Sequence, residues 1–258
     1  MIFDTHAHYD DEAFEEDRDI LLNSMQAGGV GRIVNVGASM ETSEKTVALT
    51  EQYDFLYGAV GVHPNEVGDM KTEDIDRLAS WTKRPKIVAI GEIGLDYHYD
   101  EPSKEIQFRW FEAQMELARE QKLPIIVHSR DAAKDTVDIM KAVHAGEIGG
   151  VIHCYSYTKE LAREFLNMDY YFGIGGVLTF TNAKKLKEAV AYIPMEKLVL
   201  ETDCPYLAPV PNRGKRNSSL NIPYVVEVLA QIKGISPEEA ERITWENGCR
   251  LYRMQSEQ

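Results

Sequence analysis

Residues 86–94 read KIVAIGEIG, a nearly uninterrupted apolar run with Glu92 close to its end. A strand with one solvent-exposed face alternates polar and apolar residues, whereas a strand of a parallel sheet covered by helices on both faces is apolar throughout. This stretch therefore predicts a fully buried parallel strand that carries a carboxylate near its carboxyl end.

Seven further apolar runs of the same kind lie on either side of it, at residues 1–6, 31–37, 55–62, 123–129, 149–155, 170–176 and 197–203. Segments with helical periodicity separate them; between 105 and 118, for example, Ile106, Trp110, Ala113 and Leu117 fall on one helical face. Eight strands joined by crossover helices predict the α/β class and a (β/α)8 TIM barrel. A length of 258 residues is typical of one such domain, so we expect a single domain over residues 1–258.

Two stretches near the carboxyl terminus carry local signals. The sequence SPEEAERI (236–243) predicts the start of the last helix, with Ser236 as the cap and Pro237 in the first turn. Before it, CPYLAPVPNRGKRNSSLNIP (204–223) is the longest irregular stretch and contains four of the ten prolines. A loop of this length in a compact domain is more often functional than accidental.

The overall charge limits the partners of the protein. Lys and Arg number 28 against 42 Asp and Glu, which gives a net charge of −14 that repels a nucleic-acid backbone. This charge disfavours tight, non-specific coating of DNA. It does not exclude a phosphate substrate, because a cluster of acidic and imidazole side chains that holds divalent cations reverses the local sign of the charge.

Cysteine usage and hydropathy indicate the compartment. The three cysteines, at positions 154, 204 and 249, form neither a disulfide framework nor a CxxC metal site, and they suit a reducing environment. No run approaches the length of a membrane span, and the first residues do not resemble a secretory signal. We expect a cytoplasmic protein with no membrane partner, and nothing implies an obligate protein partner.

Polar residues gather at the carboxyl ends of the predicted strands, which is where barrel active sites are built. His63 follows the third strand, and six more such residues are His6, His8, Glu92, His128, His153 and Asp203. Burying so many polar groups without partners would cost a few kcal/mol each, so a purely structural role is a poor explanation. Imidazole and carboxylate together predict a metal site.

The number of donors favours two divalent ions. Zn, Mn, Ni or Fe suits the imidazole-rich set, and Mg, which prefers oxygen, is left open. In this arrangement Glu92 bridges the ions, one ion is held by His6, His8 and Asp203, and the other is held by His128 and His153. A water molecule made acidic by the metals would be the nucleophile, and Asp203 would also act as the general base.

Nine motifs carry a resemblance to a known family. Three of them are QMELARE (114–120), GIGG (173–176) and RGKR (213–216). The other six are DTHAHYD (4–10), GVHP (61–64), GEIGLDYHYD (91–100), LPIIVHSRDA (123–132), VIHCYS (151–156) and LETDCPYLAP (200–209). Together they resemble the TatD-type metal-dependent deoxyribonucleases of the amidohydrolase superfamily over nearly the whole chain. The resemblance implies an eight-stranded barrel, divalent-metal dependence and hydrolysis of DNA from the 3′ end. It also assigns metal roles to the same six residues: His6, His8, Glu92, His128, His153 and Asp203.

The substrate side is expected to combine cations with residues of the third loop. The candidates are His63, Glu66, Arg130, Arg213, Lys215 and Arg216. An ordinary solvated loop is the alternative for the last three. Family members usually place Asn-x-Pro directly after this basic group, whereas here NSSL (217–220) intervenes. The resemblance therefore does not settle whether these basic residues contact substrate as they do in the family. The expected substrate is a DNA end or short single-stranded DNA.

Other interpretations of the same residues are retained. The binuclear site could instead hydrolyse a small amide, lactone or phosphoester, or the chain could be a non-catalytic metal-binding protein. Asp4 and Glu201 are expected either to brace the ligands or to be plain core residues. Strand alternation predicts that Cys154 points away from the site, toward the helices.

Overall fold

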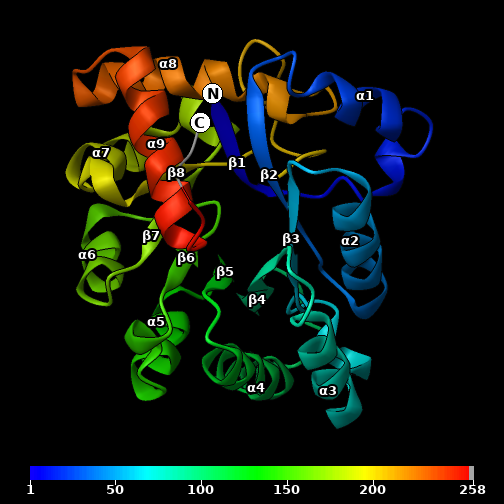
Figure 1. The fold of residues 1–258 in the computed structure, drawn as a ribbon. Coiled ribbons are helices and arrows are strands. Elements are labelled where there is room, and N and C mark those ends of the chain that lie inside the picture. The colour runs from blue at the N-terminus through cyan, green and yellow to red at the C-terminus, as the bar shows by residue number, and fades with distance from the viewer. Residues whose placement is uncertain (256–258) are drawn as a thin grey trace.

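The computed structural model describes residues 1–255, and within them eight strands form one parallel sheet in chain order (Figure 1). The strands are β1 (Ile2–Ala7), β2 (Val30–Val36), β3 (Leu56–Val60), β4 (Ile87–Asp96), β5 (Ile125–Arg130), β6 (Gly150–Ile152), β7 (Tyr171–Ile174) and β8 (Leu198–Leu200). Each apolar run of the sequence overlaps one strand, which confirms the predicted TIM barrel.

Nine α-helices of the described residues surround the strands in Figure 1. They are α1 (Arg18–Ser24), α2 (Met40–Gln52), α3 (Thr72–Trp81), α4 (Lys104–Gln121), α5 (Ala133–Ala142), α6 (Lys159–Asn167), α7 (Lys184–Tyr192), α8 (Ile222–Lys233) and α9 (Pro237–Leu251). The start of α9 is as predicted: Pro237 opens the helix, and the Ser236 side chain accepts a hydrogen bond from Glu239 N at 3.2 Å. None of these helices is both long enough and apolar enough to cross a bilayer.

The barrel closes where β1 meets the chain just beyond β8. Asp203 N donates to His6 O at 3.0 Å, His8 N donates to Cys204 O at 2.9 Å, and Ala7 pairs with Cys204 in parallel register. This closure places His6 and His8 directly beside Asp203, although nearly 200 residues separate them in the sequence.

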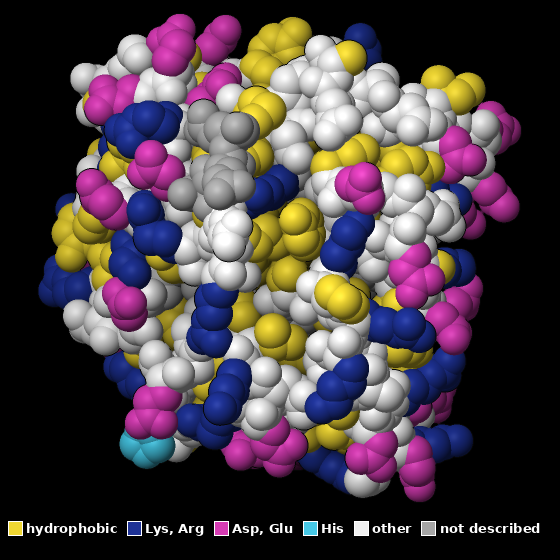
Figure 2. Space-filling view, in the orientation of Figure 1, with side chains coloured by type: hydrophobic (Ala, Val, Ile, Leu, Met, Phe, Trp, Pro, Cys, Tyr) yellow, Lys and Arg dark blue, Asp and Glu magenta, His cyan; other side chains and the backbone are white. Residues whose placement is uncertain are grey.

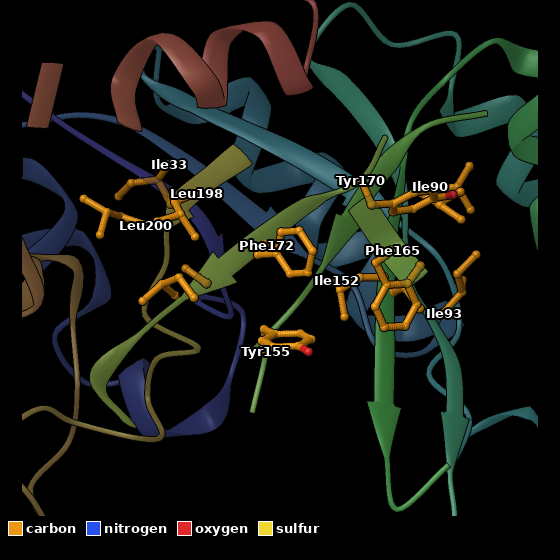
Figure 3. Close-up of a cluster of buried hydrophobic side chains, with 14 of the residues drawn as sticks. Ile33, Ile90, Ile93, Ile152, Tyr155, Phe165, Tyr170, Phe172, Leu198 and Leu200 are labelled. Carbon is orange, nitrogen blue, oxygen red and sulfur yellow. The ribbon is translucent and has the colours of Figure 1, made fainter. Parts of the chain in front are cut away.

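Large apolar side chains from neighbouring elements fill the interior between strands and helices (Figure 3). Phe172 of β7 meets Tyr155 edge to face, with ring centroids 5.0 Å apart, and Tyr155 also contacts Phe165 of α6. Leu198 and Leu200 of β8 are buried in the same cluster. These strands are apolar along their whole length because both of their faces are buried.

Helix α4 buries two glutamines that the apolar pattern did not predict. Ile106, expected on the buried face, is 36% exposed, whereas Gln107 and Gln114 are each 1% exposed. The Gln114 amide accepts from Val62 N at 2.8 Å and donates to Val62 O at 3.1 Å. The Gln107 amide binds Asp96 N and Asp96 O in the same way, both at 2.9 Å. One helix therefore holds the chain at the ends of both β3 and β4.

The face that carries the two termini is rich in Lys and Arg interspersed with acidic side chains (Figure 2). Helices of a barrel run opposite to its strands, so their carboxyl ends collect at the amino ends of the strands, where cations complement the helix dipole. Lys86 Nζ donates to Thr50 O at 2.7 Å and to Tyr53 O at 2.5 Å, beside the end of α2, and Arg253 donates to Lys122 O beyond α4. These cations serve the fold at the end of the barrel opposite the predicted site.

Candidate metal centre

The six predicted ligands converge at the carboxyl ends of the strands, around Glu92. Its Oε1 lies 2.7 Å from His128 Nδ1 and 3.8 Å from His153 Nε2, and its Oε2 lies 3.4 Å from His6 Nε2 and 3.7 Å from His8 Nε2. The carboxylate is 4% exposed. Its two oxygens thus face two groups of imidazoles, which is the arrangement that a bridging ligand requires.

Asp203 faces three of these imidazoles from the chain just beyond β8. Its Oδ1 lies 3.3 Å from His8 Nε2, 3.6 Å from His153 Nε2 and 3.8 Å from His6 Nε2. His153 is therefore nearly equidistant from the two carboxylates, rather than belonging to the Glu92 side alone. The division of ligands between two ions stays a prediction, and the proximity of all six side chains is observed.

The donor atoms of this cluster fit divalent cations. The Nε2 atoms of His6 and His8 face each other at 3.0 Å, and His6 Nδ1 is buried without a hydrogen-bond partner. Ligand atoms of His6, His8 and Asp203 all lie within 4.8 Å of one another, and so do those of the group His63, Glu92 and His128. Nitrogen and oxygen atoms that converge in this way, with few hydrogen-bond partners of their own, are typical of transition-metal ligands.

His63 lies closer to the centre than its predicted substrate-side position requires. Its Nε2 is 3.8 Å from Glu92 Oε1, and its ring centroid is 4.2 Å from that of His128. Asn65 N donates to His63 Nδ1 at 3.1 Å, which leaves Nε2 free to face Glu92. A neutral ring that accepts this bond at Nδ1 carries its proton on Nε2, so His63 is placed to donate to Glu92 or to a substrate.

The sequence reasoning missed Asp96. This carboxylate is 1% exposed, and its Oδ2 lies 3.0 Å from His128 Nε2, on the side of the imidazole that faces away from Glu92. A carboxylate that binds the second nitrogen of a ligating histidine fixes the orientation of the ring. The signal was the motif GEIGLDYHYD, but the strand was expected to end at residue 94, whereas β4 continues to Asp96.

Mutual charge sets the protonation of the cluster. Burial alone would raise the pKa of Glu92, yet His153, His128 and His6 hold it well below its usual range. Burial likewise opposes protonation of His8, but Asp203 and Glu92 outweigh it and raise the pKa to about 9. For His63, burial and the nearby His128 lower the pKa to about 3. His63 is thus neutral and available as a donor at physiological pH.

Glu201 stands directly beneath His153. Its Oε1 accepts from Cys154 N at 2.7 Å, and its Oε2 lies 3.2 Å from His153 Nδ1 without the alignment of a hydrogen bond. A Cβ at Gly173 would lie 2.0 Å from Glu201 Oε2, so only glycine leaves room for this carboxylate. Glu201 was expected either to brace a ligand or to be a plain core residue, and the geometry favours bracing of the His153 ring.

Asp4 braces the opposite side of the site. Its Oδ1 accepts from His6 N and from Thr202 N, and its Oδ2 accepts from Thr202 Oγ1 at 2.7 Å and from Ser219 Oγ at 2.6 Å. The carboxylate thereby joins β1 to the chain beyond β8 and to the residues that precede α8. Asp4 therefore positions His6 through a bond to its backbone N–H and not through a bond to its ring.

The prediction that Cys154 points away from the site was wrong. Its Sγ lies within 4.8 Å of ligand atoms of His153 and Asp203. Strand alternation does not apply to it, because β6 ends at Ile152 and Cys154 adopts a left-handed conformation with φ of 46°. Burial, together with Asp203, raises the pKa of the thiol well above its usual value, so it stays protonated.

Five of the six predicted substrate residues line two adjoining hollows, and Arg213 lines neither. The metal hollow, of about 740 Å³, is lined by His63, Glu66 and Arg130 together with the cluster. A neighbouring hollow of about 730 Å³ is lined by Lys215 and Arg216. Seven carboxylates line the metal hollow, namely Asp10, Asp11, Glu12, Glu66, Glu92, Asp96 and Asp203. An anionic substrate therefore needs bound cations there.

Two of the predicted phosphate-binding arginines have contacts within the protein. The Arg216 guanidinium forms a bidentate ion pair with Asp17 at 2.8 and 2.6 Å and covers the ring of Phe14 at 4.9 Å. The Arg213 guanidinium lies 4.4 Å from the ring centroid of Phe180. Arg216 therefore clasps the loop to the residues before α1, and its substrate role stays a prediction.

Asn217, within the inserted NSSL, closes the base of the long loop. It is 1% exposed, its Nδ2 donates to Thr202 O at 3.1 Å and Tyr206 O at 2.9 Å, and its N donates to Pro205 O at 2.9 Å. Its Oδ1 accepts from Ser218 N and Asn221 Nδ2, both at 2.9 Å. The insertion thus anchors the loop that follows Asp203.

A (β/α)8 barrel with histidines and carboxylates converging at the carboxyl ends of its strands has the architecture of a metal-dependent hydrolase. Comparisons with known proteins agree. Residues 3–253 match the family model described as TatD related DNase. The chain belongs to this TatD family of metal-dependent hydrolases.

Individual relatives match over nearly their full length. An uncharacterized metal-dependent hydrolase, YabD, of Bacillus subtilis is 45% identical over 98% of this chain and 100% of its own. A Cronobacter sakazakii protein named 3′-5′ ssDNA/RNA exonuclease TatD is 32% identical over 97% of each chain. The crystal structure of YJJV, a TatD homologue from Escherichia coli K12, superposes with a TM-score of 0.92 at 30% identity over 98% of each chain.

Proposed function

We propose that this protein hydrolyses phosphodiester bonds of DNA and removes nucleotides from 3′ ends, with two divalent ions held by the six converging side chains. The observation that carries the proposal is the pair of Glu92 oxygens, each facing its own group of imidazoles. The Cronobacter relative, named as a 3′-5′ exonuclease of single-stranded DNA and RNA, supports the choice of substrate.

The ligands would be His6, His8, Glu92, His128, His153 and Asp203, with His63 close to the second group. Bound divalent ions would bring the pKa of a water molecule toward neutrality and offset the negative charge that develops on the phosphate. The remaining tasks fall to side chains of the protein, which hold the ligands in place, position the substrate and accept a proton.

Asp203 is placed to accept the proton that the attacking water loses. Although burial alone would raise its pKa, His153, His8 and His6 lower it, so the carboxylate is ionised at neutral pH. Its side chain is 20% exposed and borders the metal hollow, which lets it reach a water molecule there. Asp96 would hold the His128 ring in its working orientation from the far side.

Two cations would orient the phosphate chain. Arg130, at the end of β5, lines the metal hollow, and Lys215 lines the neighbouring one. Seven carboxylates line the metal hollow against only two basic side chains, Lys45 and Arg130, so the hollow repels duplex DNA with its high charge density. This favours a chain end, which can enter the hollow, over the middle of a long duplex.

The test is digestion of a 5′-labelled single-stranded oligonucleotide with Mg²⁺ or Mn²⁺. We expect a ladder of products shortened from the 3′ end, abolished by a chelator. Glu92→Gln and Asp203→Asn should each lower the rate roughly a hundredfold or more. His128→Gln should act similarly, whereas the matched control His144→Gln, at an exposed position, should not.

Other outcomes would identify the alternatives. If the oligonucleotide stays intact while a lactone, amide or small phosphoester is turned over, the protein is a small-molecule hydrolase. Metal binding that is lost in His128→Gln, with no hydrolysis of any of these substrates by the parent protein, would point to a non-catalytic metal-binding protein. An RNA oligonucleotide of the same sequence would measure the preference between DNA and RNA.

A further inference from the structure

The metal hollow and the neighbouring hollow share one wall. Asp11, Glu12 and Tyr206 line both of them. Beyond this wall, the second hollow is bounded by Lys215 and Arg216, by the carboxylate of Glu15, and by uncharged residues that include Pro205. A polymer that places one bond over the metal cluster and extends into the second hollow therefore has to pass Tyr206.

Tyr206 is exposed and yet held at several points. Its side chain is 56% exposed, and its hydroxyl donates to Asp11 Oδ2 at 2.9 Å. Its backbone N donates to Asp203 O at 2.9 Å, and its carbonyl accepts from Asn217 Nδ2 at 2.9 Å. The ring is thereby fixed only three residues from a predicted metal ligand, with much of its surface open to solvent.

The second hollow offers a cation for a phosphate group. Arg216 is engaged by Asp17, whereas among residues 1–255 Lys215 has no ion pair. An aromatic ring beside a groove with a free cation is the combination by which proteins bind single-stranded nucleic acid, since bases stack on the ring and phosphates meet the cation. Small hydrolase substrates need no such extension of the site.

We propose that Tyr206 stacks on the nucleobase adjoining the scissile phosphate, and that the second hollow receives the next nucleotide with its phosphate at Lys215. This inference rests on the proposed nuclease function and deepens it. It defines the substrate as single-stranded at the cleaved position, because a base within a duplex is stacked on its neighbours and offers no free face. Stacking is tolerant of sequence, so all four bases should be accepted.

The test compares two substrates and three variants. The substrates are a 5′-labelled single-stranded oligonucleotide and the same oligonucleotide with abasic sites in place of its two 3′-terminal bases. The variants are Tyr206→Ala, Tyr206→Phe, and the matched control Tyr192→Ala, which removes a tyrosine that is 44% exposed at the end of α7. Circular dichroism and metal content verify that each variant is folded and loaded.

We expect Tyr206→Ala to lower kcat/KM on the normal oligonucleotide about tenfold to a hundredfold, which is the effect of one lost base stack. Tyr206→Phe keeps the ring and should stay within about threefold of the parent. On the abasic oligonucleotide the parent should already be slowed by a similar factor, and Tyr206→Ala should add no further loss. Tyr192→Ala should match the parent on both substrates.

Three results would overturn the inference. Equal losses in Tyr206→Ala and Tyr206→Phe would mean that the bond to Asp11 matters rather than the ring. Equal losses on the normal and abasic oligonucleotides, or no loss on either, would mean that no base lies on Tyr206. If the parent protein cleaves neither oligonucleotide, the nuclease function itself fails and this inference falls with it, a result distinct from the other two.

Discussion

The substitution Asn217→Asp tests how the long loop beyond Asp203 is anchored. It preserves the shape of a side chain that is 1% exposed and keeps both bonds accepted by Oδ1, but it replaces the Nδ2 that donates to Thr202 O and Tyr206 O. Each carbonyl then loses its donor and faces a carboxylate oxygen instead. At about 1–3 kcal/mol for each buried group left without a partner, the free energy of unfolding should fall by roughly 3 kcal/mol.

Thermal unfolding at pH 7.5 gives the first measurement. For a protein of this size, 1 kcal/mol corresponds to about 2–4 °C, so Tm should fall by roughly 6–12 °C. Burial raises the pKa of the introduced carboxyl in the folded state, and its protonated form can donate one of the lost bonds. The loss of Tm should therefore be smaller at pH 5 than at pH 7.5.

Limited proteolysis gives the second measurement. The loop closed by Asn217 contains Arg213, Lys215 and Arg216, and loosening it should speed tryptic cleavage there. The control is Asn23→Asp, the same chemical change at an exposed position of α1. If Asn217→Asp unfolds within about 1 °C of the parent and is cleaved no faster, the loop is not held by this amide and the reasoning is refuted.

Three further outcomes are expected. Nearby carboxylates outweigh burial and raise the pKa of His8 to about 9 and that of His153 to about 10, so protons compete with an ion for both rings at lower pH. Calorimetric titration with Mn²⁺ should therefore show affinity rising at least about tenfold per pH unit between pH 6 and 8, and a constant affinity would contradict this. Gln107→Met removes the partners of the Asp96 backbone N–H, the Asp96 carbonyl and the Pro102 carbonyl. The free energy of unfolding measured in urea should therefore fall by about 3 kcal/mol, and an unchanged urea midpoint would show that these bonds are not needed. Gly173→Ala would place a methyl group 2.0 Å from Glu201 Oε2 and should reduce the metal content of the purified protein by displacing His153, while full retention of metal would rule out this support.

The barrel and the convergence of the ligands could be predicted because both depend on short stretches of sequence. A strand buried on both faces is apolar along its whole length, as residues 86–94 are, and the carboxyl ends of parallel strands meet at one mouth. His6 and Asp203 could therefore be placed together without knowledge of any contact between them. The observed separation of 3.8 Å between His6 Nε2 and Asp203 Oδ1 follows from barrel closure.

The remaining features depend on details that periodicity does not encode. Asp96 was missed because β4 runs two residues beyond its apolar core, and Cys154 was misplaced because the chain turns to a left-handed conformation just after β6. Gln107 was missed because a buried amide that satisfies a loop backbone looks like a surface residue in the sequence. Asp4 and Ser219 are 215 residues apart, and no local pattern pairs them.

The ring of hydrogen bonds around Asn217 has a consequence for how relatives of this protein could diverge. Because Thr202, Pro205, Tyr206 and Asn217 are tied together at the base of the loop, the residues between Leu207 and Arg216 form a cassette whose two attachment points are fixed. Its length and sequence can change without moving β8 or Asp203, which follows that strand. New substrate preferences could thus be acquired by exchanging this cassette alone, while the chemistry of the barrel is inherited intact.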